Sequence, residues 1–127
     1  MSRCSILLID DDDLFRKVVR LMLERAGHTV ADAVEGGDGM RQYREKRYDV
    51  VITDLIMPGK EGLETIRELR AFDPEARIIA VSGGGRVDSR DYLPMARAFG
   101  AGRVLEKPFT DVELLQAIEA LVGERPR

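Results

Sequence analysis

Short apolar runs and longer amphipathic segments alternate along the chain. Three runs are rich in branched apolar residues, at positions 6–9, 50–52 and 78–81. Continuous apolar runs of this kind are typical of strands buried on both faces of a parallel sheet. Two weaker runs, at 28–33 and 103–106, predict two further strands.

The segments between these runs carry apolar residues at helical spacing. The first segment ends at Gly27, which we interpret as a helix stop, and it contains Leu14, Val18, Leu21 and Met22. The later segments contain Met40 and Tyr43, then Leu63, Ile66 and Leu69, then residues 91–99, and finally residues 111–122. Five strand–helix units joined by right-handed crossovers predict an α/β fold, a doubly wound five-stranded parallel sheet with helices on both faces.

The fourth helical segment contains a proline. Pro94 lies inside the stretch from 89 to 99. An interior proline removes a backbone donor and costs a helix about 3 kcal/mol, whereas in the first turn its missing N–H does no harm. We therefore predict that this helix begins late or kinks.

Length, charge and cysteine content limit the classes of protein. We expect the 127 residues to form one domain, with its core over about 4–122 and residues 123–127 as a tail or the start of a linker. The net charge of −3 lacks the basic excess that phosphate-backbone binding needs, so we expect no direct nucleic-acid partner. Cys4 is the sole cysteine, and we interpret it as a small apolar residue at the start of the first strand. No apolar run reaches the length of a membrane span or a signal-peptide core, which predicts a cytoplasmic protein without membrane insertion.

Acidic residues follow two of the predicted strands. Asp10, Asp11, Asp12 and Asp13 follow the first strand, and Asp54 ends the third. The carboxyl ends of parallel strands share one edge of the sheet, which is where ligands bind in open α/β folds. Clustered carboxylates repel one another unless they recruit a cation, and oxygen ligands without His or Cys favour Mg²⁺. A simpler interpretation of Asp12 and Asp13 is that they cap the helix that follows.

Two more polar residues are predicted at the same edge. Lys107 follows the fifth strand and Ser82 ends the fourth, directly before three glycines. Taken alone, a lysine is most often a solvated surface residue. A carboxylate nucleophile, an acid cluster, a hydroxyl and an ammonium group at one edge would nevertheless suit phosphoryl transfer to Asp54.

Four pieces of the sequence, in this order and at this spacing, resemble the receiver domains of bacterial two-component response regulators. They are residues 6–11, the block 54–62, Ser82 after an apolar strand, and residues 107–109. The resemblance extends from Ile6 to about Leu121. It implies a flavodoxin-like sheet of order 2-1-3-4-5, as in chemotaxis regulators.

The resemblance also implies a role for each polar residue of the site. Asp54 would accept the phosphoryl group, Ser82 would hydrogen-bond its oxygen, and Lys107 would pair with it. The bond between Lys107 and Pro108 is often cis in relatives. The chain would be a phosphorylation-dependent switch rather than an enzyme, although it undergoes phosphoryl transfer to itself.

A divalent cation, Mg²⁺ or Mn²⁺, is implied as the cofactor. Asp11 and Asp54 would bind it through their side chains, Ile56 through its backbone carbonyl, and Asp10 through water. Ile56 also predicts slow self-dephosphorylation, because its bulk shields the phosphoryl group and it cannot orient a water molecule.

The implied partners are a sensor histidine kinase or a histidine phosphotransfer protein, and an unknown downstream protein. Output would go through the face of the fourth helix, fifth strand and fifth helix, with Tyr92, Leu93 and Val104 as candidate contacts. Val104 stands where many relatives place an aromatic residue that swings inward. Ser82 and the glycine-rich loop after it are our candidate for the moving element, although such loops are often only surface loops.

Other interpretations fit the sequence less well. A flavin-binding module would need its phosphate loop where the four aspartates stand, and these would repel a phosphate. A phosphatase of the haloacid dehalogenase type needs a second acid two residues after the nucleophile, at the position of Ile56. The glycine triplet lacks the ending of a nucleotide P-loop. An interaction module of the same fold that no longer needs phosphate stays open, and we interpret His28 as a structural residue.

Overall fold

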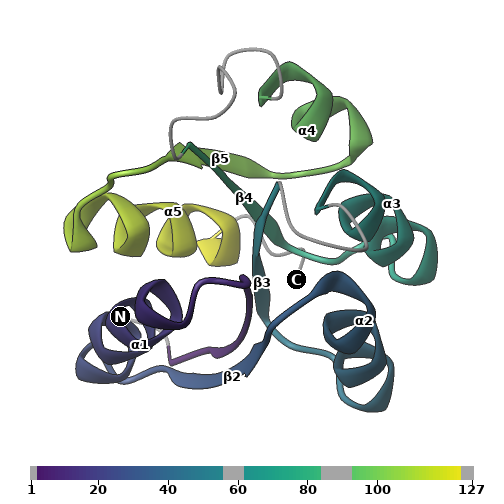
Figure 1. Ribbon diagram of the computed structural model, residues 1–127. Coiled ribbons are helices and arrows are strands. Elements are labelled where there is room, and N and C mark those ends of the chain that lie inside the picture. The colour runs from purple at the N-terminus through teal and green to yellow at the C-terminus, as the bar shows by residue number, and fades with distance from the viewer. Residues whose placement is uncertain (1–2, 56–61, 84–92, 124–127) are drawn as a thin grey trace.

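Five parallel strands form a single sheet (Figure 1). The computed structural model describes residues 3–55, 62–83 and 93–123. The strands are β1 (Ser5–Ile9), β2 (Thr29–Ala33), β3 (Val50–Asp54), β4 (Ile78–Ser82) and β5 (Arg103–Glu106). Their order is β2-β1-β3-β4-β5, and each neighbouring pair is parallel. The predicted strand order is therefore confirmed.

Helices cover both faces of this sheet. They are α1 (Asp13–Arg25), α2 (Gly36–Glu45), α3 (Gly62–Phe72), α4 (Leu93–Phe99) and α5 (Asp111–Gly123). In Figure 1, α1 and α5 lie on one side and α2, α3 and α4 on the other. Each side has its own buried apolar cluster, so the fold is the doubly wound α/β architecture that the sequence predicts. None of the helices in the described residues is long and apolar enough to cross a membrane.

Burial separates the central strands from the edge strands. Every residue of β3 and β4 is buried, and so is β1 after its first residue. The outer strands β2 and β5 are mostly half-buried. This explains why the three apolar runs predict the interior strands clearly, because a strand covered on both faces has no position where a polar side chain reaches water.

Helix α1 shows how a cap and a buried stripe define a helix. The Asp12 side chain accepts hydrogen bonds from the N–H groups of Leu14 and Phe15, so the capping interpretation is confirmed for Asp12. The helix buries Val19 and Leu23 against the sheet. It ends before Gly27, whose φ of 96° favours glycine, as the predicted stop requires.

Pro94 lies in the first turn of α4, which runs Leu93–Phe99. In this position its missing N–H is not needed by the helix. The predicted late start concerns residues 89–92, which lie outside the described residues, so it stays a prediction.

His28 and Cys4 are structural residues, as predicted. The strand that we expected to begin at His28 begins at Thr29. His28 is 4% exposed, and its Nδ1 accepts a hydrogen bond of 3.0 Å from the backbone N–H of Cys4, which is also buried. Burial lowers the pKa of His28, with Glu119 acting in the opposite direction.

Candidate functional site

Three carboxylates meet at the carboxyl edge of the sheet. Asp10 follows β1, Asp54 ends β3, and the pairing of Ile9 with Thr53 sets the two strands side by side. Asp10, Asp11 and Asp54 each offer an oxygen, and these oxygens all lie within 4.8 Å of one another. Asp10 is 1% exposed and Asp54 is 9% exposed, so two of the three charges lie below the surface.

Lys107 contributes a positive charge to this carboxylate cluster. Its Nζ lies 3.1 Å from Asp10 Oδ2 and 3.9 Å from Asp54 Oδ2. The bond between Lys107 and Pro108 is cis, as the family resemblance implies. The two distances make the ammonium group a member of one cluster with Asp10, Asp11 and Asp54, and not a solvated surface group.

Ser82 is tied to Lys107 through the backbone. Ser82 is buried at the end of β4, and its carbonyl accepts a hydrogen bond of 2.7 Å from the Lys107 N–H. Gly83 follows with a φ of 127°, and a Cβ there would lie 3.0 Å from the Lys107 carbonyl oxygen. Glycine at position 83 thus allows the backbone directly after β4 to lie close to Lys107.

The electrostatics of Asp10 suit a site that binds a cation. Burial raises the pKa of Asp10, and the nearby Asp11 charge acts in the same direction. The Asp12 N–H, at 2.9 Å, and the Lys107 ammonium lower the pKa but do not fully offset burial. Carboxylate oxygens at this spacing are the donors that Mg²⁺ takes, so the residues present fit a divalent metal ion.

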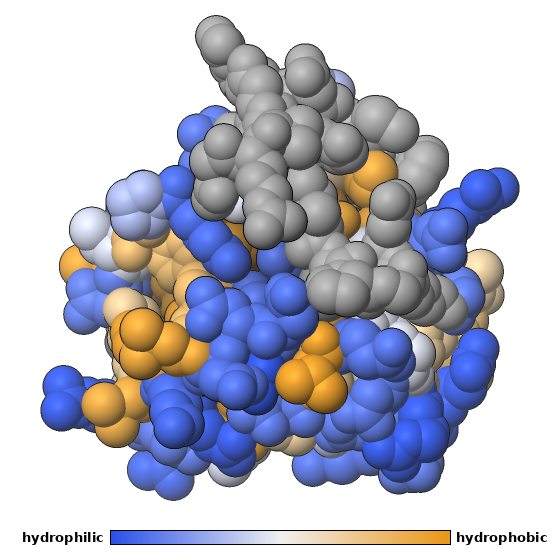
Figure 2. Space-filling model, viewed as in Figure 1, coloured by the Kyte–Doolittle hydropathy of each residue, from blue (hydrophilic) through white to orange (hydrophobic). Residues whose placement is uncertain are grey.

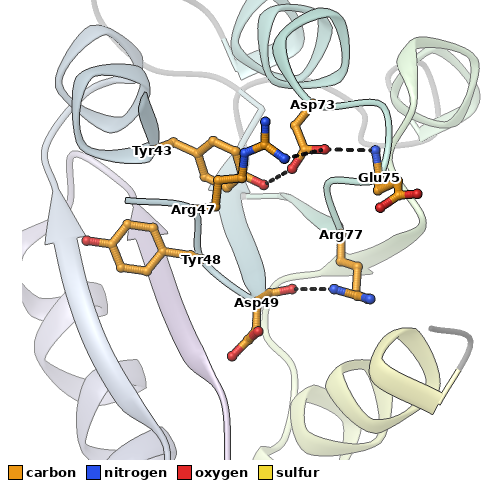
Figure 3. A pocket seen from close by; sticks show the side chains of 7 residues that line it. All are labelled: Tyr43, Arg47, Tyr48, Asp49, Asp73, Glu75 and Arg77. Carbon is orange, nitrogen blue, oxygen red and sulfur yellow. Dashed lines mark hydrogen bonds and ion pairs between the residues drawn. The ribbon is translucent and has the colours of Figure 1, made fainter. Parts of the chain in front are cut away.

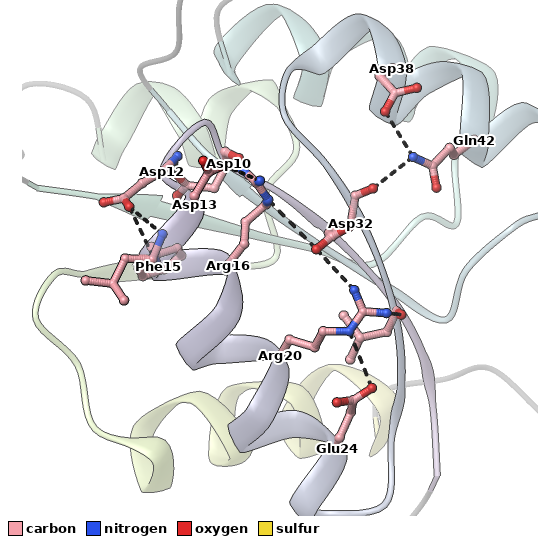
Figure 4. A network of polar contacts seen from close by, with 12 residues as sticks. Asp10, Asp12, Asp13, Phe15, Arg16, Arg20, Glu24, Asp32, Asp38 and Gln42 are labelled. Atoms are coloured by element: carbon pink, nitrogen blue, oxygen red, sulfur yellow. Dashed lines mark hydrogen bonds and ion pairs between the residues drawn. The ribbon is translucent and has the colours of Figure 1, made fainter.

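Arg16 holds the loop that carries Asp10 and Asp11, and the sequence analysis missed it. Its guanidinium donates a hydrogen bond of 2.8 Å to the carbonyl of Asp10 and forms an ion pair with Asp13 (Figure 4). It also lies 3.8 Å from Asp32 on β2. The contact with Asp10 is to backbone, which leaves no residue-type pattern in the sequence from which to predict it.

The remaining predicted residues lie away from the carboxylate cluster or outside the described residues. Val104 is half-buried on β5, is paired with Ala80 and packs against the core on the side of α3. Ile56 and Tyr92 lie outside the described residues, and of Leu93 only its place at the start of α4 is described.

A pocket lies at the opposite edge of the sheet from the carboxylate cluster (Figure 3). This pocket of about 360 Å³ is lined by Tyr43, Arg47, Tyr48, Asp49, Asp73, Glu75 and Arg77. Tyr43 donates a hydrogen bond of 2.6 Å to Asp73, and burial followed by this contact raises the pKa of Tyr43. The groups are engaged with one another, which is the pattern of a structural network.

Comparison with known proteins identifies the family. Residues 6–119 match the response regulator receiver domain. The chain belongs to this family. The match covers both the acidic cluster and Lys107, so the resemblance inferred from four short pieces of sequence is confirmed.

Individual relatives of this receiver domain differ in length. The transcriptional regulatory protein AfsQ1 of Streptomyces coelicolor is 39% identical over 95% of the chain, which spans 53% of that relative. Protein PilH of Pseudomonas aeruginosa is 34% identical, with 93% of the chain and 97% of PilH covered. A response regulator receiver domain protein from Clostridium thermocellum has a TM-score of 0.87 at 32% identity, with 94% of each chain covered. The receiver therefore resembles both whole proteins and parts of longer ones.

Proposed function

We propose that this receiver domain is a phosphorylation-dependent signalling switch in which Asp54 accepts a phosphoryl group. The donor is a sensor histidine kinase, a histidine phosphotransfer protein or a small phosphodonor. The observation that carries the proposal is the meeting of Asp10, Asp11 and Asp54, with the Lys107 ammonium beside Asp10 and Asp54. A role in such signalling fits a cytoplasmic protein.

Each residue has a part in the proposed transfer. An oxygen of Asp54 attacks phosphorus while the bond to the donor breaks, which leaves a mixed anhydride on the carboxylate. The Lys107 ammonium pairs with the phosphoryl oxygens, and the Ser82 hydroxyl hydrogen-bonds one of them. The charge of Lys107 and the hydroxyl donor of Ser82 stabilise the negative oxygens of the phosphoryl group.

The family resemblance assigns the metal ligands as proposals. Asp11 and Asp54 would hold Mg²⁺ or Mn²⁺ through side chains, Asp10 through water, and Ile56 through its carbonyl. When bound, the ion supplies positive charge that offsets the charge of the phosphoryl group. Ile56 also carries the proposal that self-dephosphorylation is slow.

Output is proposed to reach an unknown downstream protein at the face of α4, β5 and α5. Tyr92, Leu93 and Val104 are the candidate contacts there. Ser82 and the loop after it are the proposed two-state element that phosphorylation biases. The hydrogen bond from the Lys107 N–H to the Ser82 carbonyl supports this choice, because it joins Lys107 to the residue at which β4 ends and the loop begins.

A mass measurement tests the proposed function. We expect the protein, incubated with Mg²⁺ and acetyl phosphate, to gain the mass of one phosphate that hydroxylamine removes. Asp54→Asn should abolish the gain, and Asp11→Asn should weaken Mg²⁺ binding because it removes a ligand. Asp111→Asn is the matched control, since Asp111 is an exposed aspartate in the first turn of another helix, α5.

The outcomes separate the candidate functions. Full labelling of Asp54→Asn would contradict the assignment of the acceptor. Absence of labelling in the wild type would instead favour an interaction module of the same fold that works without phosphate.

A further inference from the structure

The Lys107 ammonium has an aromatic neighbour as well as its acidic partners. Its Nζ lies 4.0 Å from the centroid of the Phe15 ring, within the range of a cation–π contact. Asp10 and Asp54 lie 3.1 Å and 3.9 Å from the same nitrogen. The ammonium thus contacts a neutral, electron-rich ring face in addition to two carboxylates.

The Phe15 ring is itself held in place. Phe15 lies in the first turn of α1, where its N–H donates a hydrogen bond of 3.1 Å to the capping Asp12 side chain. Its ring meets that of Phe109 edge to face, with centroids 5.8 Å apart and an interplanar angle of 89°. Lys107 and Phe109 belong to one loop, so this loop contacts the ring both through the ammonium and through the second ring. Such an edge-to-face pair restricts how far the ring can turn.

A fixed ring matters because a lysine side chain is long and flexible. Four methylene groups give the ammonium many rotamers, and ordering them costs entropy. A carboxylate alone attracts the ammonium toward itself, whereas a ring face attracts it without forming an ion pair. The ring can therefore restrain the nitrogen between Asp10 and Asp54 and leave its charge available to an incoming anion.

We propose that Phe15 is a positioning residue for Lys107, holding the ammonium where it can meet the phosphoryl group on Asp54. This inference rests on the proposed function, since the position of Lys107 affects labelling only if Asp54 is phosphorylated. It assigns a role to a residue of α1 that lies outside the four sequence pieces that resemble the family.

The competing interpretation is that Phe15 only fills space. Phe15 lines an apolar groove of about 410 Å³ between α1 and the loop at Lys107, together with residues such as Val18, Met22 and Phe109. Phe15→Leu keeps an apolar side chain there but removes the ring face. Phe15→Tyr keeps the ring, and the pair separates positioning from filling.

A control for the loss of a cation–π contact exists elsewhere in the chain. Phe72 at the end of α3 lies 6.0 Å and 5.6 Å from the guanidinium carbons of Arg44 and Arg47. It also packs against Tyr43, which lines the pocket at the opposite edge of the sheet. Phe72→Leu therefore makes the same chemical change away from the cluster of Asp10, Asp11 and Asp54.

The first measurement is independent of phosphorylation. Protons over the face of an aromatic ring resonate upfield, so the ε-methylene protons of Lys107 should be shifted upfield in the NMR spectrum of the wild type. We expect Phe15→Leu to remove this shift, and Phe15→Tyr and Phe72→Leu to retain it. An unshifted Lys107 in the wild type would overturn the contact and the proposal with it.

The second measurement is the rate of labelling by acetyl phosphate at saturating Mg²⁺. We expect Phe15→Leu to be labelled about threefold more slowly, as the loss of one partly exposed cation–π contact implies. Phe15→Tyr and Phe72→Leu should be labelled at close to the wild-type rate. If thermal melting shows that Phe15→Leu is unfolded, Phe15→Met, which also fills the groove without a ring, takes its place.

The failures of the two ideas are distinguishable. If the wild type takes up no phosphate, the proposed function is wrong. If the wild type is labelled and Phe15→Leu is labelled equally fast, or if Phe15→Tyr slows as much as Phe15→Leu, the positioning role is overturned while the acceptor assignment stands.

Discussion

Asp10 shows how single residues make a buried charge tolerable at this site. An ionised carboxylate at 1% exposure has lost nearly all of its water. The Asp12 N–H and the Lys107 ammonium replace part of that hydration, but burial still raises the pKa of Asp10. A further positive charge beside Asp10 would therefore be favourable, which is the condition for metal binding here.

The Tyr43–Asp73 contact supports a prediction about stability and pH. Burial alone would raise the pKa of Asp73, but the Tyr43 hydroxyl, the Glu75 N–H and the charges of Arg47 and Arg70 together outweigh it. They hold this pKa below its ordinary value of 3.8. A lowered acid pKa stabilises the fold above that ordinary value, and this contribution is lost as the pH falls through the folded-state value. Tyr43→Phe should lower the free energy of unfolding at pH 7 by about 1.5–3 kcal/mol.

Urea denaturation across the pH range measures this effect. The difference between wild type and Tyr43→Phe should shrink as the pH falls below 3.8, because Asp73 is then becoming neutral in both proteins. The control is Tyr48→Phe, since the Tyr48 hydroxyl points away from Asp73 in Figure 3. A constant difference at all pH values would contradict the assignment to Asp73.

Gly62 is a residue whose lack of a side chain shapes the site. A Cβ at Gly62 would lie 1.9 Å from the carbonyl oxygen of Asp54 and 2.6 Å from the Cα of Leu55. Gly62→Ala should therefore lower the free energy of unfolding by about 1–3 kcal/mol or more and slow the labelling of Asp54. Gly123→Ala, where nothing lies within 4 Å of the added carbon, should cost nothing. Equal stabilities of the two variants, measured by urea denaturation, would contradict the close approach of α3 to β3.

At the scale of elements, α1 has apolar residues on both its buried and its exposed sides. Val19 and Leu23 face the sheet, whereas Leu14, Val18 and Leu21 are 70%, 44% and 52% exposed. Figure 2 shows apolar side chains at the surface on the side of α1 and α5. The helical spacing of Leu14, Val18 and Leu21 thus predicted the helix correctly, although these residues do not form its buried stripe.

This orientation predicts unequal effects of two neighbouring leucines. Leu23→Ala should lower the free energy of unfolding by about 2–5 kcal/mol, because Leu23 is fully buried and its removal leaves a cavity. Leu21→Ala should change it by no more than about 0.5 kcal/mol. Chemical denaturation of both variants measures the difference, and a larger loss at Leu21 would mean that α1 is rotated relative to the sheet.

At the scale of the molecule, the proposed switch requires phosphorylation of Asp54 to change residues that lie away from it. β4 lies between β3 and β5, and the Ser82 carbonyl accepts the Lys107 N–H across that edge. We predict that amide chemical shifts change over residues 83–106 when acetyl phosphate is added with Mg²⁺. Asp54→Asn under the same conditions is the control and should show no such change. Shift changes confined to the acidic cluster would contradict output through β5 and its neighbours.

The buried strands and the glycines of α2 are predictable from sequence to different degrees. A strand that is buried on both faces requires a continuous apolar run. Strands β1, β3 and β4 can therefore be predicted from their own residues, without knowledge of the strands that pair with them. The glycines of α2 are different, because helix propensity disfavours them. A Cβ at Gly39 would lie 2.3 Å from the Ile9 side chain, so glycine there is explained by close helix–strand packing and not by local preference.

The sequence by itself determined the alternation of strands and helices and placed its chemical groups at strand ends. Both follow from local periodicity and from the rule that parallel strands share an edge. Only the tertiary structure decided that Lys107 lies 3.1 Å from Asp10, 97 positions away, and that Phe15 and Arg16 reach the same site. Distances of this kind depend on strand register and helix rotation, which arise from packing between distant segments and which local periodicity does not encode.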